Sequence, residues 1–342
     1  MPDVGAIRSL GVADLALLRR RLARYSNADT KRALLQLATT ALLLLASAAA
    51  LFYGVTRDIW LGACFAPPAA LFVVRLFIIQ HDCGHGSFFS SRRANDALGL
   101  VASVLTLIPY HFWRRDHAIH HATSGNLDRR GNGDVTTLTV REYLAQSWLR
   151  KILYRLYRHP LVLLGLGPAY MLLVRYRIPS GDSLRSWSDW VSILGTNIAA
   201  AFGATAMVMT IGPVTFLVTW GAVMLLALSI GVWLFYVQHQ FEDAYWEPAD
   251  RWNFHAAALG GSSFYDLPRV LHWLSGSIGF HHIHHLASKI PNYRLRACFE
   301  ETPELQCVKR LTLWASVKSI GLTLWDEQRR QLISFRALAR TR

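Results

Sequence analysis

The sequence predicts an all-α integral membrane protein with four transmembrane helices in two hairpins and a helical cytoplasmic cap that carries a histidine-rich di-metal site. Three observations lead to this prediction. The 342 residues are 52% hydrophobic yet carry a formal net charge of +14, two long stretches are almost free of charge, and nine histidines gather in three short motifs. Apolar bulk combined with concentrated basic charge is typical of a membrane protein with a basic water-exposed side.

The two charge-poor stretches divide into four spans, because a helix needs about 20 residues to cross a bilayer. The first stretch is free of charge from Ala33 to Thr56, and a further apolar run reaches Gln80 with Arg75 and a proline pair inside it. The second stretch is too long for one crossing and is broken at Gly212-Pro213. We expect spans at residues 33–55, 59–80, 190–210 and 214–237.

The distribution of lysine and arginine predicts the orientation of these spans. The segments outside them hold 34 of the 36 basic residues on one side, in residues 1–32, 81–189 and 238–342. The positive-inside rule places that side, with both termini and all histidine motifs, in the cytoplasm. We therefore expect a cytoplasmic N-terminal segment (1–32), a membrane domain that bears the site (33–300) and a cytoplasmic helical C-terminal tail (301–342).

Two loop segments are too apolar to be merely solvated. Ala97 to Ile108 is too short to span a bilayer and ends at Pro109, which favours a shallow or re-entrant helix. Trp148 to Arg177 mixes leucine, tyrosine and tryptophan with six arginine or lysine residues, the pattern of a helix that lies in the headgroup layer. We expect this second segment to hold the cap against the membrane.

The histidine motifs have the spacing of metal ligands on helices. His81 and His85 form HxxxH, and two further motifs, at residues 117–121 and 281–285, contain HxxHH. Residues three and four apart share one helix face, so each motif can direct two or three imidazoles at one point. His239 follows the fourth span directly. Neutral imidazole suits iron, copper, zinc or nickel, and the number of histidines leaves room for more than one ion.

The motifs also carry a family resemblance. The segments "HDCGH", "HAIHH" and "HHIHH" resemble the membrane fatty acid desaturase family. Three longer segments resemble its bacterial and cyanobacterial acyl-lipid (Δ12/Δ5-type) branch: "HHATSGNLDRRGNGDVTTLTV" from His120, "FYVQHQFEDAYW" from Phe235 and "GFHHIHHLASKIPNYRL" from Gly279. The resemblance covers residues 33 to 300.

The resemblance implies a non-haem di-iron enzyme of the inner membrane that uses O2 and two external electrons to introduce a cis double bond into an acyl chain of a membrane glycerolipid. The ligands it implies are His81, His85, His117, His120, His121, His239, His281, His284 and His285. His282 is expected to be a neighbour of the site. Several carboxylates are expected, by proximity in the sequence, to accept the second N–H of a ligand imidazole. They are Asp82, Asp116, Asp128, Asp134, Glu242 and Asp243. Phe235 and Ser277 stand where some relatives have asparagine, so an asparagine ligand is not implied.

Electrons must come from a separate carrier, because the chain contains neither a cytochrome b5 haem motif nor a CxxC pair for an iron–sulfur centre. A ferredoxin-like or cytochrome b5-like protein is expected, and no bound haem or flavin. A nucleic-acid partner is not expected, since the sequence has no zinc-finger or RNP pattern. The oligomeric state is left open.

Other functions remain open alternatives. A di-iron lipid hydroxylase or a carotenoid oxygenase or ketolase could use the same motifs. A metal transporter would place its ligands near the bilayer midplane on repeated broken helices, whereas these motifs lie at one face. A zinc peptidase would require HExxH, which is absent from the sequence.

Overall fold

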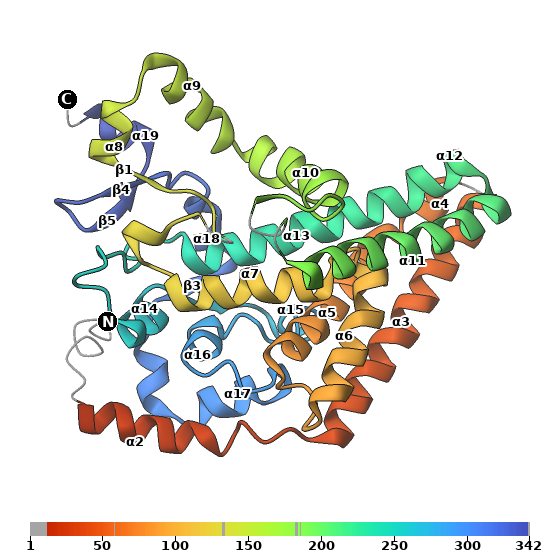
Figure 1. The fold of residues 1–342 in the computed structure, drawn as a ribbon, viewed down its shortest axis with the longest axis horizontal. Helices are drawn as coiled ribbons and strands as arrows, with labels where there is room; N and C mark the ends of the chain where they lie inside the picture. The colour runs from red at the N-terminus through yellow and green to blue at the C-terminus, as the bar shows by residue number, and fades with distance from the viewer. Residues whose placement is uncertain (1–11, 58, 132–133, 182–183, 185, 341–342) are drawn as a thin grey trace.

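The computed structural model describes residues 12–340 except residues 58, 132–133, 182–183 and 185. Four of its helical segments are long and apolar enough to cross a membrane, which confirms the four predicted spans. They are Thr30–Arg57, Trp60–His85, Trp187–Ile211 and Pro213–His239. The spans extend to one side in Figure 1, and the remaining helices and strands form a cap at their other end.

The first hairpin joins α3 (Thr30–Arg57) to α4 (Ile59–Ala63) and α5 (Ala66–His85). Its turn is close-packed because two glycines meet there: a Cβ on Gly54 would lie 2.6 Å from the Cα of Gly62. Prolines fill the first turn of α5, where the missing N–H is not needed. The second hairpin joins α11 (Trp187–Ile211) to α12 (Pro213–Phe216), η5 (Leu217–Gly221) and α13 (Ala222–His239).

The apolar segment after the first hairpin forms two helices, α6 (Arg92–Thr106) and α7 (Tyr110–Thr123), which meet at an angle of 101°. α6 packs along α5, so α7 is turned across the ends of the spans. Tyr110 fixes this bend. Its hydroxyl donates to the Cys83 carbonyl at 2.8 Å, and its ring fills the space beside Gly99. The bend places the histidines of α7 above α5.

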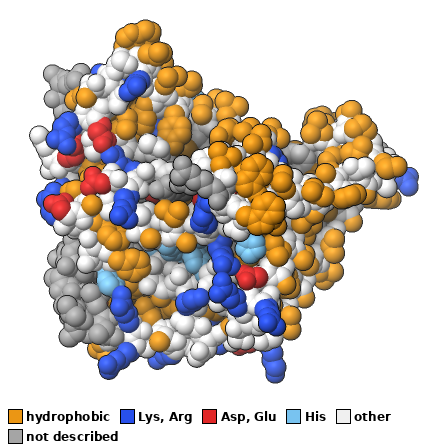
Figure 2. Space-filling model, in the orientation of Figure 1, with side chains coloured by type: hydrophobic (Ala, Val, Ile, Leu, Met, Phe, Trp, Pro, Cys, Tyr) orange, Lys and Arg blue, Asp and Glu red, His pale blue; other side chains and the backbone are white. Residues whose placement is uncertain are grey.

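The predicted headgroup-layer segment is built from α9 (Trp148–Tyr157), η2 (Val162–Leu166), α10 (Gly167–Tyr170) and η3 (Met171–Arg175). Trp148, Leu149, Ile152, Leu153 and Leu156 are exposed on α9, alternating with basic side chains. Figure 2 shows hydrophobic side chains over α9 and α10 at the top of the molecule. This amphipathic surface suits a helix lying at the membrane surface.

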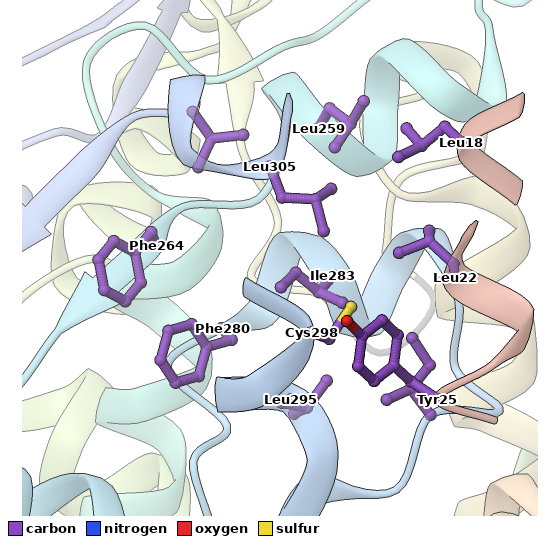
Figure 3. Packing of buried hydrophobic residues seen from close by; sticks show 12 residues of the cluster. Leu18, Leu22, Tyr25, Leu259, Phe264, Phe280, Ile283, Leu295, Cys298 and Leu305 are labelled. Carbon is purple, nitrogen blue, oxygen red and sulfur yellow. The ribbon is translucent and has the colours of Figure 1, made fainter. Parts of the chain in front are cut away.

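The cap has a hydrophobic core of its own, shown in Figure 3. Leu18 and Leu22 of α2 (Val12–Ala23) pack there against Ile283 of α16 (His281–Leu286). Other residues of the core come from α14 (Phe254–Gly260), α17 (Asn292–Glu300) and η6 (Pro303–Cys307). The N-terminal segment therefore holds α16 in place from behind.

The C-terminal tail was expected to be helical, and this expectation is wrong in part. Residues 301–342 form α18 (Leu313–Ser319) and α19 (Phe335–Arg340), but also three short strands. β3 (Arg310–Thr312) runs parallel to β2 (Phe264–Asp266), and β4 (Leu324–Asp326) lies between β1 (Leu138–Thr139) and β5 (Gln331–Ile333). Strands of two or three residues are too short to show an alternating pattern, so their partners decide their conformation. The remaining short elements are η1 (Leu127–Arg129), α8 (Val140–Ala145) and α15 (Arg269–Leu274).

Arg158 ties this tail to the last span. It is 2% exposed and follows α9. Its guanidinium donates to the Tyr236 hydroxyl at 3.1 Å, to Gln240 Oε1 at 3.1 Å and to the Leu322 carbonyl at 2.8 Å. A single side chain thus joins the headgroup-layer segment, α13 and the C-terminal sheet.

We expect Arg158→Met to destabilise the cap by about 2–4 kcal/mol, because buried acceptors would lose a charged donor. The thermal midpoint of the purified protein in detergent should fall, and trypsin should cut the C-terminal tail sooner. Arg150→Met, which removes an exposed arginine of α9, is the control and should change neither. Equal behaviour of the two variants would contradict the role of Arg158.

Candidate metal centre

The first histidine motif occupies the last turn of α5, where the second span meets the cap. His81 and His85 are one turn apart and point to the same side of the helix, with ring centroids 4.8 Å apart. Gly86 ends the helix in the left-handed conformation, with φ 64°. The chain therefore turns away directly after His85 and leaves the end of the helix open to the cap.

The second and third motifs lie on α7 and α16, the two helices that cross above the spans. His117 and His121 share one face of α7, and His120 points away from His121 by roughly the 100° that one residue turns a helix. On α16, His281 and His285 share a face, and His284 is turned aside. His121 and His285 stack with ring centroids 4.2 Å apart, so the two helices meet at the site.

The structure brings all nine predicted ligands together in two groups. The five-histidine group contains His81, His85, His117, His121 and His284. The four-histidine group contains His120, His239, His281 and His285. Within each group the potential ligand atoms lie within 4.8 Å of one another. His239, the last residue of α13, is the contribution of the fourth span.

The spacing of the ring nitrogens within each group fits a metal-ion shell. Nε2 of His117 lies 3.1 Å from Nε2 of His81, and Nε2 of His281 lies 2.9 Å from Nε2 of His239. Two nitrogens each about 2.1 Å from an ion and at right angles would be about 3.0 Å apart. The observed separations are therefore those of neighbouring ligands on one ion.

The outer nitrogens show which way the lone pairs point. Nδ1 of His239 lies 3.0 Å from the Gly261 carbonyl, Nδ1 of His81 lies 3.1 Å from Asp82, and Nδ1 of His120 lies 2.7 Å from Asp134. A carbonyl or carboxylate only accepts, so each of these Nδ1 atoms carries the proton. Nε2 is then unprotonated, so its lone pair is free to bind a metal ion, and it faces the centre of its group.

Burial keeps the imidazoles of the third motif neutral. Burial first, and then the charge of neighbouring histidines, lowers the pKa of His281, His284 and His285 well below the usual 6.5. Nε2 of His85 is buried and has no hydrogen-bond partner among the described residues. Converging neutral imidazoles with inward lone pairs need a cation between them, and the donor set fits first-row transition metals.

The other predicted neighbours of the site lie in different surroundings. Asp82 contacts His81, as described. Asp116 instead pairs with Arg175 at 2.6 Å and with Arg115 at 3.3 Å, and Glu242 is exposed. His282 points to the cap core, where its Nε2 lies 3.1 Å from the Leu305 carbonyl.

Of the remaining predicted carboxylates, Asp134 lies beside His120, as expected, whereas Asp128 accepts from the Ala249 N–H and Asp243 pairs with Lys309. Two contacts of the site were not singled out from the sequence: the Gly261 carbonyl holds His239, and the Trp113 ring stacks on His117 with centroids 4.5 Å apart. Trp113 is near the second motif in the sequence, so proximity to the histidines was a usable signal for it. No sequence signal marks a backbone carbonyl.

A cavity of about 510 Å³ adjoins both histidine groups. His81, His117, His120 and His281 line one part of it. The rest of its wall is largely apolar and comes from α5, α13 and the η2–α10–η3 segment, including Val73, Ile78, Leu163, Met171, Met224 and Leu228. The cavity can therefore accept an apolar chain alongside two metal ions, and its volume is typical of a ligand site.

Comparison with known proteins agrees with this arrangement. The fatty acid desaturase family matches residues 58–316. A fatty acid desaturase of Bacillus subtilis (strain 168) is 43% identical over 321 residues, which cover 94% of this chain and 91% of the relative. An sn-1 acyl-lipid omega-3 desaturase (ferredoxin) of Synechocystis is 30% identical over 66% of this chain and 62% of its own length. An sn-1 oleoyl-lipid 12-desaturase of Synechocystis is 28% identical over 64% and 62%.

Substituting one ligand candidate should abolish binding of the ion at its own group and leave the other ion bound. We expect His85→Ala to lose the ion of the five-histidine group and His239→Ala the ion of the four-histidine group, so each variant keeps about one of two ions. Elemental analysis of purified protein after anaerobic loading with Fe²⁺ measures this. The double variant should hold none. Full loading of either single variant would exclude that residue from the ligand set.

The lowered histidine pKa values predict a pH dependence for the metal-free protein. Below about pH 6.5 the unfolded chain takes up protons at His281, His284 and His285, whereas the folded chain does not. The unfolded state is therefore favoured by acid, and the thermal midpoint should fall by several degrees between pH 7.5 and pH 5.5. Tryptophan fluorescence in detergent reports the midpoint. A midpoint that rises on acidification would contradict the burial of neutral imidazoles.

Proposed function

This chain belongs to the fatty acid desaturase family, and we propose that it introduces a cis double bond into an acyl chain of a membrane glycerolipid at a centre of two non-haem iron ions. Oxygen-dependent desaturation of lipid acyl chains is the activity of the family. The catalytic unit is proposed to extend over residues 33–300, with residues 1–32 and 301–342 as cytoplasmic segments.

The observation that carries the proposal is the apolar cavity that reaches both histidine groups. An unactivated C–H bond offers no leaving group and no acidic proton, so side-chain acid–base or nucleophilic catalysis has nothing to act on. Bound iron would supply the oxidising power drawn from O2. The protein's own task is then to place two adjacent methylene groups beside the histidines and to exclude water from them.

Particular residues fit these tasks. His81, His85, His117, His121 and His284 are proposed to hold one iron, and His120, His239, His281 and His285 the other. Asp82, Asp134 and the Gly261 carbonyl hold the outer nitrogens of three of these ligands and so fix their orientation. The ring of Phe235 lies 4.9 Å from the His120 ring and 5.1 Å from the His239 ring, and it also lines the cavity. It forms an apolar surface that excludes water from one side of the four-histidine group.

The electrons are proposed to come from a separate ferredoxin-like carrier. One relative is named a ferredoxin-dependent enzyme. Figure 2 shows Lys and Arg side chains gathered over α7 and the cap below it, with histidine side chains between them. Such a basic face would attract an acidic carrier, and the distribution of basic charge supports its placement on the cytoplasmic side of the inner membrane.

Expression in a bacterial host that lacks polyunsaturated lipids tests the function. We expect a new double bond in the acyl chains of membrane lipids, detected as fatty-acid methyl esters with mapping of its position. His85→Ala should insert into the membrane at the normal level and form no product. A hydroxylated or ketolated product would assign the chain to another di-iron chemistry, and tightly bound zinc without iron would contradict the iron centre.

A further inference from the structure

A buried chain of polar side chains connects the five-histidine group with the first span. It begins at His81 and passes through Asp82 to Asn292, the first residue of α17. It then reaches Gln36 and Thr40 in α3. Every member is buried, with exposed fractions between 0% for Thr40 and 6% for Gln36. Buried polar groups of this kind require partners, and here each residue forms a hydrogen bond with the next, the last of them through the Gln36 backbone carbonyl.

The hydrogen bonds between these side chains are short, and from α3 onward each donor points toward Asp82. Asp82 Oδ2 accepts from the backbone N–H of Asn292 at 2.6 Å and from its side-chain amide at 2.9 Å. Because a carboxylate only accepts, the amide nitrogen of Asn292 must face Asp82, which leaves Asn292 Oδ1 for Gln36. Gln36 Nε2 donates to it at 2.9 Å. All donors therefore point toward Asp82.

The far end of the chain is an arginine inside a membrane span. Arg75 is 5% exposed, and its Nε donates to Thr40 Oγ1 at 3.1 Å, while Thr40 in turn donates to the Gln36 carbonyl at 2.6 Å. The guanidinium lies over the Trp273 ring, 4.1 Å from its centroid. No carboxylate among the described residues forms an ion pair with it. A cation at this depth is costly, which makes a functional role the first hypothesis.

We propose that Asn292 and Gln36 are positioning residues for the five-histidine group, acting on His81 through Asp82. Two donors from Asn292 fix the Asp82 carboxylate, whose other oxygen holds the Nδ1 proton of His81 at 3.1 Å. Nε2 of His81 then stays free to bind a metal ion. Gln36 and Arg75 anchor this arrangement in the first hairpin, so that α3, which supplies no ligand itself, governs the geometry of one ion.

The chain is suited to holding an orientation rather than to moving protons. Two of its links, Asn292 and Gln36, are amides that neither gain nor lose a proton near neutral pH. Among the described residues, no such connection joins the four-histidine group to α3: Nδ1 of His239 is held by the Gly261 carbonyl and Nδ1 of His120 by Asp134. A substitution that breaks a hydrogen bond in this row of polar side chains should therefore weaken the binding of one ion and leave the binding of the other unchanged.

The test is a titration of metal-free full-length protein in detergent with Co²⁺, followed by its visible absorption and by equilibrium dialysis. This inference rests on the proposed di-metal function, so wild type must first bind two ions. We expect Asn292→Ala and Gln36→Leu each to weaken one of the two ions about tenfold or more, with an altered cobalt spectrum for that ion alone. Gln36→Met, which nearly keeps the size but removes the donor, should behave like Gln36→Leu.

Thr39→Val is the matched control, because the Thr39 hydroxyl bonds only to the backbone of its own helix at Leu35 and Gln36. It should bind both ions as wild type does. Wild-type affinity and spectrum in Asn292→Ala and in both Gln36 variants would overturn the positioning role, as would an equal loss of both ions, which indicates a general folding defect. A wild-type protein that binds fewer than two ions would overturn the di-metal proposal itself.

Discussion

The rest of this structure depends on one electrostatic constraint, the convergence of nine imidazoles on two centres. Each group brings several ring nitrogens to separations near 3 Å. Nε2 lone pairs that face one another at this distance repel, and a cation bound between them relieves the repulsion. The ends of α5 and α13, the bend between α6 and α7, and the placement of α16 all serve to bring these nitrogens together.

The apolar parts of the molecule have complementary tasks. The cap core behind α16, with Ile283 at its centre, keeps that helix pressed toward the histidines of α7. The spans and the η2–α10–η3 segment form the wall of the cavity. The ligand candidates thus lie where a polar cap meets an apolar interior, and an acyl chain can reach them without leaving a hydrophobic environment.

Most of the fold and the three histidine motifs could be predicted from the sequence, because charge-free runs and i, i+3, i+4 spacing are local signals. His239 lies in no motif, and it was included because it directly follows the fourth span and because the family resemblance implies it. The division of the histidines into two groups could not be predicted, since it depends on how α7 and α16 cross. The roles of Gly261 and Asn292 were also hidden, because a backbone carbonyl has no sequence signature and Asn292 acts through residues 210 and 256 positions away. The strands of the C-terminal tail were missed for a similar reason: each is defined by a distant partner rather than by its own pattern.

The sharing of α7 and α16 between the two groups has a consequence for how such a site can change. Adjacent residues, His120 with His121 and His284 with His285, belong to different groups. Inserting or deleting one residue in either helix would rotate every later ligand by about 100° and disturb both ions at once. The helices α5 and α13 each serve a single group. Substitutions at the ends of α5 and α13 can therefore change the surroundings of one ion during evolution without affecting the other. In α7 and α16, by contrast, an insertion or deletion among the histidines is excluded because it would affect both.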